Sequence, residues 1–61
     1  EVQIVVQING KKRGIVKVKR ETKESDLINI LNNDIKIKKY LLGKNIQRQI
    51  YIKNKLINII L

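Results

Sequence analysis

A regular alternation of apolar and polar residues at the start of the chain most restricts how it can fold. Residues 2–8 form an extended segment whose period of two is typical of a strand that buries one face, and its inward positions are Val2, Ile4, Val6 and Ile8. The turn dipeptide Asn9-Gly10 follows, and residues 14–18 resume the alternation. The segment predicts a β-hairpin with one strongly apolar face.

The apolar faces of the two strands decide which turn we expect. A two-residue turn at 9–10 would pair Ile8 with Lys11 and would mix apolar and charged residues on one face. A three-residue loop at 8–10, with a G1 bulge, pairs Gln7 with Lys11 and aligns the apolar faces. We therefore expect the bulged loop, with Lys12 at the rim of the apolar face and these cations on the solvent face: Lys11, Arg13, Lys17 and Lys19.

The middle of the chain has helical spacing. Thr22 is the expected N-cap of a helix over about 23–32, and Asn33-Asp34 ends it and caps a second, shorter helix that stops at Gly43. The apolar positions recur three and four residues apart, as a helix that packs on a core requires. They are Leu27, Ile28, Ile30 and Leu31, then Ile37, Tyr40 and Leu41.

The last third of the chain predicts two more strands joined by a turn at 53–55. In residues 46–52 we expect Ile50 and Ile52 on the apolar side and Tyr51 on the opposite side. Residues 56–61 are apolar except for Asn58, which needs a hydrogen-bond partner. An apolar run suits a central strand and charged strands suit edges, so the first and fourth strands are expected inside. The prediction is a two-layer α+β domain of ββααββ order, a four-stranded sheet with both helices on one face.

The amino-acid composition argues against most kinds of catalytic or metal site in this chain. A chain of 61 residues is a single domain near the lower size limit, and without Cys or His it has no disulfide, thiolate or imidazole. The hydroxyls of Thr22 and Ser25 have no His or paired acid to activate them. We therefore expect an aliphatic core, no catalytic residues, no metal and no cofactor in this chain. The missing Met and the apolar start suggest a piece of a longer protein.

The net charge of +9 is unevenly distributed. Residues 11–20 hold six cations and no acid, and residues 35–61 hold seven more, again without an acid. Four of the five acids lie between these segments, where helix N-termini favour carboxylates. The cations are left uncancelled, and such a field attracts a polyanion, nucleic acid before an anionic membrane surface. Surplus lysine that only aids solubility is the competing interpretation.

Three motifs, taken together in this order and spacing, resemble a known family. They are VVQINGKKRG at 5–14, KYLLGK at 39–44 and IYIKNKLINII at 50–60, and they look like the C-terminal domain of the bacterial-type leucyl-tRNA synthetases. The chain departs from the family pattern where it has Lys12 for an apolar residue, Leu42 for an acid and Lys53-Asn54 for Pro-Gly. Asn54 can adopt the left-handed conformation that glycine would supply.

The resemblance implies a role in positioning RNA. In that family the C-terminal domain follows a flexible linker and contacts the elbow of tRNA-Leu, where the D and T loops meet. Aminoacylation and editing take place in other domains, and the cofactors of the parent enzyme are ATP and Mg²⁺. We therefore expect residues 1–61 to be the C-terminal tRNA-binding domain of a larger, cytoplasmic leucine–tRNA ligase, monomeric and without membrane contact.

A tRNA corner presents phosphates, which flexible cations and backbone N–H groups bind. Arg13 is the expected bidentate or stacking group, and the lysines act as point charges. The predicted RNA-binding residues are Lys11, Lys12, Arg13, Lys17, Lys44, Arg48, Lys53 and Lys55. An alternative stays open: a protein-interaction module that docks its basic face on an acidic partner or on the enzyme body.

Overall fold

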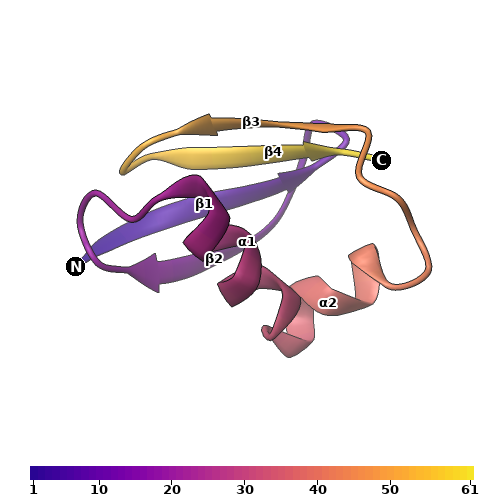
Figure 1. The fold of residues 1–61 in the computed structure, drawn as a ribbon, viewed down its shortest axis with the longest axis horizontal. Helices are drawn as coiled ribbons and strands as arrows, with labels where there is room; N and C mark the ends of the chain where they lie inside the picture. Colours follow the sequence, from indigo (N-terminus) through magenta and orange to yellow (C-terminus); the bar gives the residue numbers. More distant parts are fainter.

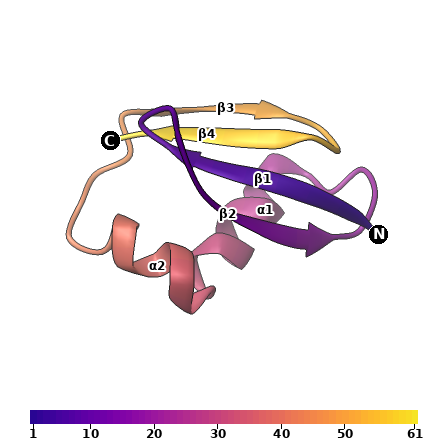
Figure 2. The same cartoon turned by 180° about the vertical axis from the view of Figure 1, so that it is seen from behind.

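The fold consists of a four-stranded sheet with two helices packed on one face (Figures 1 and 2). The computed structural model describes residues 1–61. The elements in chain order are β1 (Val2–Ile8), β2 (Lys11–Val18), α1 (Glu24–Asn32), α2 (Ile35–Leu41), β3 (Arg48–Ile52) and β4 (Leu56–Ile60). The strand order is β2-β1-β4-β3, with β1 and β4 parallel and both outer pairs antiparallel. The predicted class, element order and central strands are confirmed.

The core is built only from aliphatic side chains. Alternate residues of β1 and β4 face the helices because successive side chains of a strand point to opposite faces. The fully enclosed members include Ile4, Leu27, Leu31, Ile57 and Ile59, and no polar or charged residue is buried. Burial of each such side chain stabilises the fold by about 1.5–3 kcal/mol relative to exposure. Neither helix has the length and apolar character that a membrane span requires.

The hairpin turn differs from the prediction. Asn9 and Gly10 both have positive φ, 52° and 84°, and form a two-residue turn in which Ile8 pairs with Lys11. Asn-Gly favours this turn because its twist matches that of the flanking strands. The predicted three-residue loop is wrong.

A bulge inside β2 corrects the mismatch of faces that the short turn creates. Gln7 pairs with Lys12 and Val6 with Gly14, so Arg13 is the extra residue without a partner in the ladder. Beyond this point the even-numbered residues of β1 and β2 align as predicted. The bulge therefore exists, three residues later than expected, and it changes where the adjacent cations point.

Side-chain amides hold the turn against the end of β4. The Asn9 Oδ1 accepts a hydrogen bond from the Leu61 N–H at 2.9 Å, and the Asn58 Oδ1 accepts one from the Gly10 N–H at 3.0 Å. The predicted need of Asn58 for a partner is confirmed. Both contacts join residues about fifty positions apart, and they tie the turn to the last strand.

The two helices begin differently. Asp34 caps α2 as predicted, because its Oδ1 accepts from the N–H groups of Lys36 and Ile37 at 2.9 and 3.3 Å. The predicted cap of α1 is wrong: the N-cap is Lys23 without a side-chain bond, and the Thr22 hydroxyl donates to the Lys19 carbonyl at 2.6 Å. The apolar stripe of α1 is also narrower than predicted, since Ile30 is exposed.

The faces of β3 are reversed relative to the prediction. Tyr51 pairs with Ile57 and faces the helices, and its hydroxyl donates to the Thr22 carbonyl at 2.7 Å. Ile50 and Ile52 lie on the uncovered face of the sheet, 45% and 47% exposed. One side of β3 carries Arg48, Ile50 and Ile52 and the other carries Gln49 and Tyr51. Each side mixes polar and apolar residues, so alternation alone does not decide which side is buried. Pairing with β4 places Tyr51 opposite the buried Ile57, and on the helix side its hydroxyl finds a partner.

Candidate nucleic-acid interface

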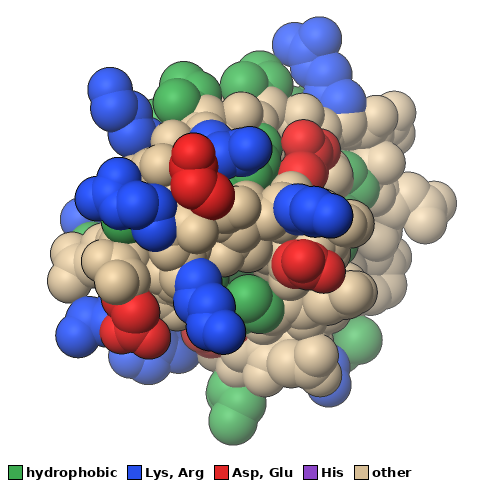
Figure 3. Space-filling model, turned by 60° about the vertical axis from the view of Figure 1, so that its left-hand side comes forward, with side chains coloured by type: hydrophobic (Ala, Val, Ile, Leu, Met, Phe, Trp, Pro, Cys, Tyr) green, Lys and Arg blue, Asp and Glu red, His purple; other side chains and the backbone are tan.

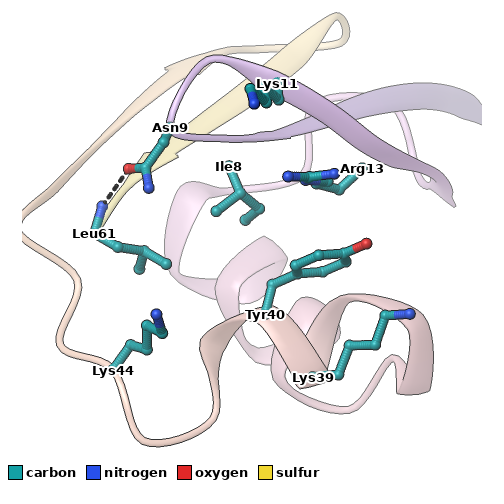
Figure 4. Close-up of a pocket in the computed structure, with 8 residues that line it drawn as sticks. All are labelled: Ile8, Asn9, Lys11, Arg13, Lys39, Tyr40, Lys44 and Leu61. Atoms are coloured by element: carbon teal, nitrogen blue, oxygen red, sulfur yellow. Dashed lines mark hydrogen bonds between the residues drawn. The ribbon is translucent and has the colours of Figure 1, made fainter.

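One end of the molecule carries an open pocket of about 370 Å³ (Figure 4). Because β1 and β4 run parallel, the β1–β2 turn and the end of β4 lie at this end, close to the loop after α2 (Figure 1). Four of the eight lining residues are lysine or arginine and none is acidic. We call this site the basic pocket, and its lining is Ile8, Asn9, Lys11, Arg13, Lys39, Tyr40, Lys44 and Leu61.

The hairpin places two of the predicted cations in the basic pocket. Lys11 shares the helix side of the sheet with its pairing partner Ile8, and Arg13, the bulged residue, lies on the same side. The Arg13 guanidinium carbon lies 4.9 Å from the centroid of the Tyr40 ring, a cation–π distance. The prediction that Lys11 and Arg13 face away from the helices is wrong, because it assumed the three-residue loop.

Lys12, Lys17 and Arg48 lie on the uncovered face of the sheet. Lys12 pairs with Gln7 and Lys17 with Gln3, and these partners alternate with the buried residues of β1. Arg48 pairs with Ile60 on the same face. These three cations therefore surround the exposed apolar side chains of the sheet and do not join the basic pocket. Lys12 is not at the rim of the apolar core, contrary to the prediction.

Lys53 and Lys55 lie in the β3–β4 turn, at the end of the sheet opposite the basic pocket (Figure 1). Asn54 between them adopts the positive φ that was expected, 66°, and its Nδ2 donates to the Glu21 carboxylate at 2.8 Å. Figure 3 turns this side of the molecule forward and shows acidic groups among the basic ones. The Glu21 carboxylate beside this turn therefore partly offsets the positive charge of the two lysines.

The carboxylates are held by neutral donors. Glu24 accepts from the Gln49 amide at 2.7 Å, Glu21 accepts from Asn54, and Asp34 caps α2. Their structural roles leave the pocket cations available for an external anion. A concave surface lined by one sign of charge concentrates its field, which favours a polyanion.

Two pocket residues, Lys39 and Tyr40, were not among the predicted contacts. The Lys39 Nζ lies 5.2 Å from the centroid of the Tyr40 ring, on the opposite wall from the hairpin. Tyr40 was expected in the core, and it does pack against the buried cluster. Its contact with Arg13 joins residues 27 positions apart, and only the packing of α2 on the hairpin shows it.

Sequence comparison finds relatives over nearly the whole chain. The chain is 51% identical over 59 residues to a leucine–tRNA ligase of Lawsonia intracellularis, and the match covers 97% of this chain and 7% of the relative. The leucine–tRNA ligase of Borrelia garinii is 46% identical over 59 residues, and that of Buchnera aphidicola subsp. Baizongia pistaciae is 43% identical over 58, again about 7% of each relative. The chain thus spans a small fraction of the proteins that it matches. No family model matches it.

A solved structure has the same fold. It is the ternary complex of the Agrobacterium radiobacter K84 agnB2 LeuRS with tRNA and LeuAMS, with a TM-score of 0.87 over 97% of this chain and 8% of that one. The sequence identity is 22%, so this likeness shows the fold. Together with the closer sequence matches, it confirms the resemblance seen in the motifs. The chain is therefore homologous to one segment of the bacterial leucyl-tRNA synthetases.

Proposed function

We propose that this chain is the C-terminal tRNA-binding domain of a leucyl-tRNA synthetase and that it contacts the elbow of tRNA-Leu. The observation that carries the proposal is the convergence of four cations in one pocket without an acid: Lys11, Arg13, Lys39 and Lys44. They come from β2, from α2 and from the loop after α2. The homology to leucine–tRNA ligases, and the presence of tRNA in the complex of the LeuRS with the same fold, support an RNA partner.

In this role the domain performs no bond-making step. Its cations neutralise phosphates at the corner of the tRNA, and contacts to phosphates fix position and orientation without reading bases. Folded RNA is recognised largely by its shape and by backbone and 2′-OH contacts. The tRNA is held at its corner while its acceptor end reaches catalytic and editing sites in other domains. ATP and Mg²⁺ belong to those domains in this proposal.

The direct test is binding of a tRNA-Leu transcript to the 61-residue chain at several salt concentrations. If four cations neutralise phosphates, the slope of log affinity against log salt lies near about −3 to −4. The slope is measured by fluorescence anisotropy with labelled tRNA. An affinity that does not change with salt would reject the proposal.

The elbow is tested with a matched pair of RNAs. The first is the full tRNA-Leu transcript, and the second is a minihelix of acceptor stem and T arm that lacks the D loop. We expect the minihelix to bind more weakly, because the D–T corner is absent. If the minihelix binds as tightly as the full transcript, the interaction is a general attraction between a basic protein and RNA and does not involve the elbow.

A second candidate function has an observation in its favour. The uncovered face of the sheet exposes Ile15, Ile50 and Ile52 by 45–47%, among the cations Lys12, Lys17 and Arg48. An apolar area rimmed by polar residues is typical of a protein contact. On this hypothesis the domain packs against the body of its synthetase through the uncovered face.

Charge reversal separates the two functions. Substituting the pocket residues Lys11 and Arg13 by Glu removes tRNA binding without unfolding the domain if the basic pocket binds RNA. The double variant Ile50→Ser and Ile52→Ser leaves tRNA binding unchanged on that hypothesis, and it weakens association with the synthetase body on the second. Circular dichroism checks that each variant is folded.

A further inference from the structure

We propose that the basic pocket holds a backbone phosphate of the RNA through Arg13, and that Tyr40 is the residue that positions Arg13 for it. This inference rests on the proposed function and deepens it by naming the ligand group and a neutral residue on which affinity depends. It follows from three features of the fold: a bulge, a glycine and a ring.

The two-residue turn and the bulge together place Arg13 in the pocket and the rest of β2 in register with β1. As the extra residue between Lys12 and Gly14, Arg13 has no partner in β1, and bulges commonly redirect a side chain in this way. Regular alternation after the two-residue turn would put Arg13 on the same side as Lys11 without this correction, but it would then turn the rest of β2 inside out. With the bulge, Arg13 stays on the helix side and Val16 and Val18 return to the core.

A glycine lets α2 come close enough for its ring to meet Arg13. A Cβ at Gly14 would lie 3.1 Å from the Ile37 Cδ1, which is tighter than ordinary van der Waals contact. Ile37 is buried, and Tyr40 follows it by three residues on the same side of α2. The close approach at Gly14 therefore sets the distance between Tyr40 and the hairpin.

The ring holds Arg13 without using its hydrogen-bond donors. The cation–π contact at 4.9 Å uses none of the five guanidinium N–H groups in a hydrogen bond to the protein. Those N–H groups remain available for a phosphate, which they can bind in bidentate fashion. Lys11 and Lys44 line the same pocket and supply further positive charge (Figure 4).

A side chain that is already ordered loses less entropy when the ligand binds. Immobilising a long side chain costs roughly 0.5–1.5 kcal/mol, which corresponds to about two- to tenfold in affinity. Loss of the ring thus lowers affinity for RNA although no charge is removed. Other substitutions that remove no charge and reduce the stability of the fold by a similar amount do not lower the affinity for RNA.

The test compares Tyr40→Leu with Tyr40→Phe, using the tRNA-Leu transcript and fluorescence anisotropy. We expect Tyr40→Leu to bind about three- to tenfold more weakly with the same salt slope, and Tyr40→Phe to bind like the parent. Tyr51→Leu is the matched control, because Tyr51 also packs against the core but has no cation over its ring. It should lose stability and keep its affinity for tRNA.

A double-mutant cycle assigns the effect to Arg13. Arg13→Gln lowers the salt slope by about one, and in that background Tyr40→Leu causes no further loss. Additive losses, or a Tyr40→Leu variant that binds like the parent, overturn the positioning role while the proposed function stands. Failure of the parent chain to bind tRNA in a salt-dependent way overturns both.

A measurement on the parent chain needs no variant. The ring current of Tyr40 shifts the Arg13 Cδ proton resonances upfield if the guanidinium lies over the ring in solution. We expect this shift in free protein and its persistence when tRNA is added. Arg13 resonances at ordinary positions would overturn the inference even if Tyr40→Leu failed to fold.

Discussion

At the scale of single residues, asparagines occupy turn positions with positive φ in a chain that has only three glycines. Asn9 and Asn54 both have positive φ, at 52° and 66°, which short polar side chains tolerate better than others. Asn54 also uses its amide twice: its Oδ1 accepts from the Glu21 N–H and its Nδ2 donates to the Glu21 carboxylate, both at 2.8 Å. Glu21 has a positive φ of 68°, so one asparagine supports two unusual backbone conformations.

The matched substitutions Asn54→Ala and Asn54→Gly separate these two contributions. Asn54→Ala loses both hydrogen bonds and places an alanine at positive φ, which together cost about 2 kcal/mol of unfolding free energy. Asn54→Gly loses only the hydrogen bonds and costs about half as much. Urea denaturation followed by circular dichroism measures both. Equal stability of the two variants would show that the backbone conformation carries no cost here.

At the scale of elements, α2 is too short to be stable without packing. A helix of seven residues depends on its cap and on tertiary contacts, and α2 has the Asp34 cap and the buried side chains Ile37 and Leu41. The same helix carries two residues of the basic pocket, Lys39 and Tyr40. The order of the pocket therefore depends on how α2 is capped and packed.

Removal of the α2 cap should reduce stability selectively. Asp34→Ala leaves the Lys36 N–H without a partner, while the Ile37 N–H keeps its 3.1 Å bond to the Asp34 carbonyl. The loss costs about 1 kcal/mol, which lowers the melting temperature by about 4–8 °C in a domain of this size. Asp26→Ala is the control with the same change in charge, because Asp26 lies in the first turn of α1 and accepts none of these cap bonds. If the two variants melt together, charge and not capping is responsible.

The contact between Gly14 and Ile37 makes a second prediction for α2. Gly14→Ala brings a Cβ to 3.1 Å from the Ile37 Cδ1, and we expect a loss of about 1 kcal/mol through overpacking. Ile37→Val removes that Cδ1, so Gly14→Ala should cost less in the Ile37→Val background. Thermal unfolding of the two single variants and the double variant measures the coupling. Strictly additive costs would exclude the contact as the cause.

At the scale of the whole molecule, charge is divided between two ends. Lys11, Arg13, Lys39 and Lys44 meet at the basic pocket, whereas Lys53 and Lys55 flank a turn whose Asn54 binds Glu21. Figure 3 shows acidic and basic groups mixed on the side away from the pocket. The uncompensated positive charge is thus concentrated at the pocket end, and an RNA should approach the molecule from that end.

Two double variants with equal net charge test this polarity. Lys11→Gln with Lys44→Gln should reduce the salt slope of tRNA binding by about 2, because two phosphate contacts are lost. Lys53→Gln with Lys55→Gln removes the same charge at the other end and should reduce the slope by less than about 1. Equal reductions would mean that net charge alone, and not its position, governs binding.

The sequence by itself determined the element order, the central strands, the aliphatic core, the Asp34 cap and the left-handed Asn54. These depend on local preference and on hydrophobic period, which a sequence carries directly. It also determined that cations exceed acids, and it carried the motifs that identify the relatives. The faces predicted for the cations of the hairpin depended on its register, and the local sequence allowed two registers.

Only the tertiary structure decided where those cations lie. The short Asn-Gly turn shifts the register of β2 by one residue relative to the predicted loop, and the bulge at Arg13 shifts it back. The apolar faces therefore align as predicted, but Lys11, Lys12 and Arg13, which lie between the two shifts, are on the opposite side from the prediction. The same limit led to the wrong side for Tyr51 in β3, where each face mixes polar and apolar residues. The packing of α2 on Gly14 then added Lys39 and Tyr40 to the site. Register and packing depend on contacts between distant residues, and therefore the pocket exists only in the folded chain.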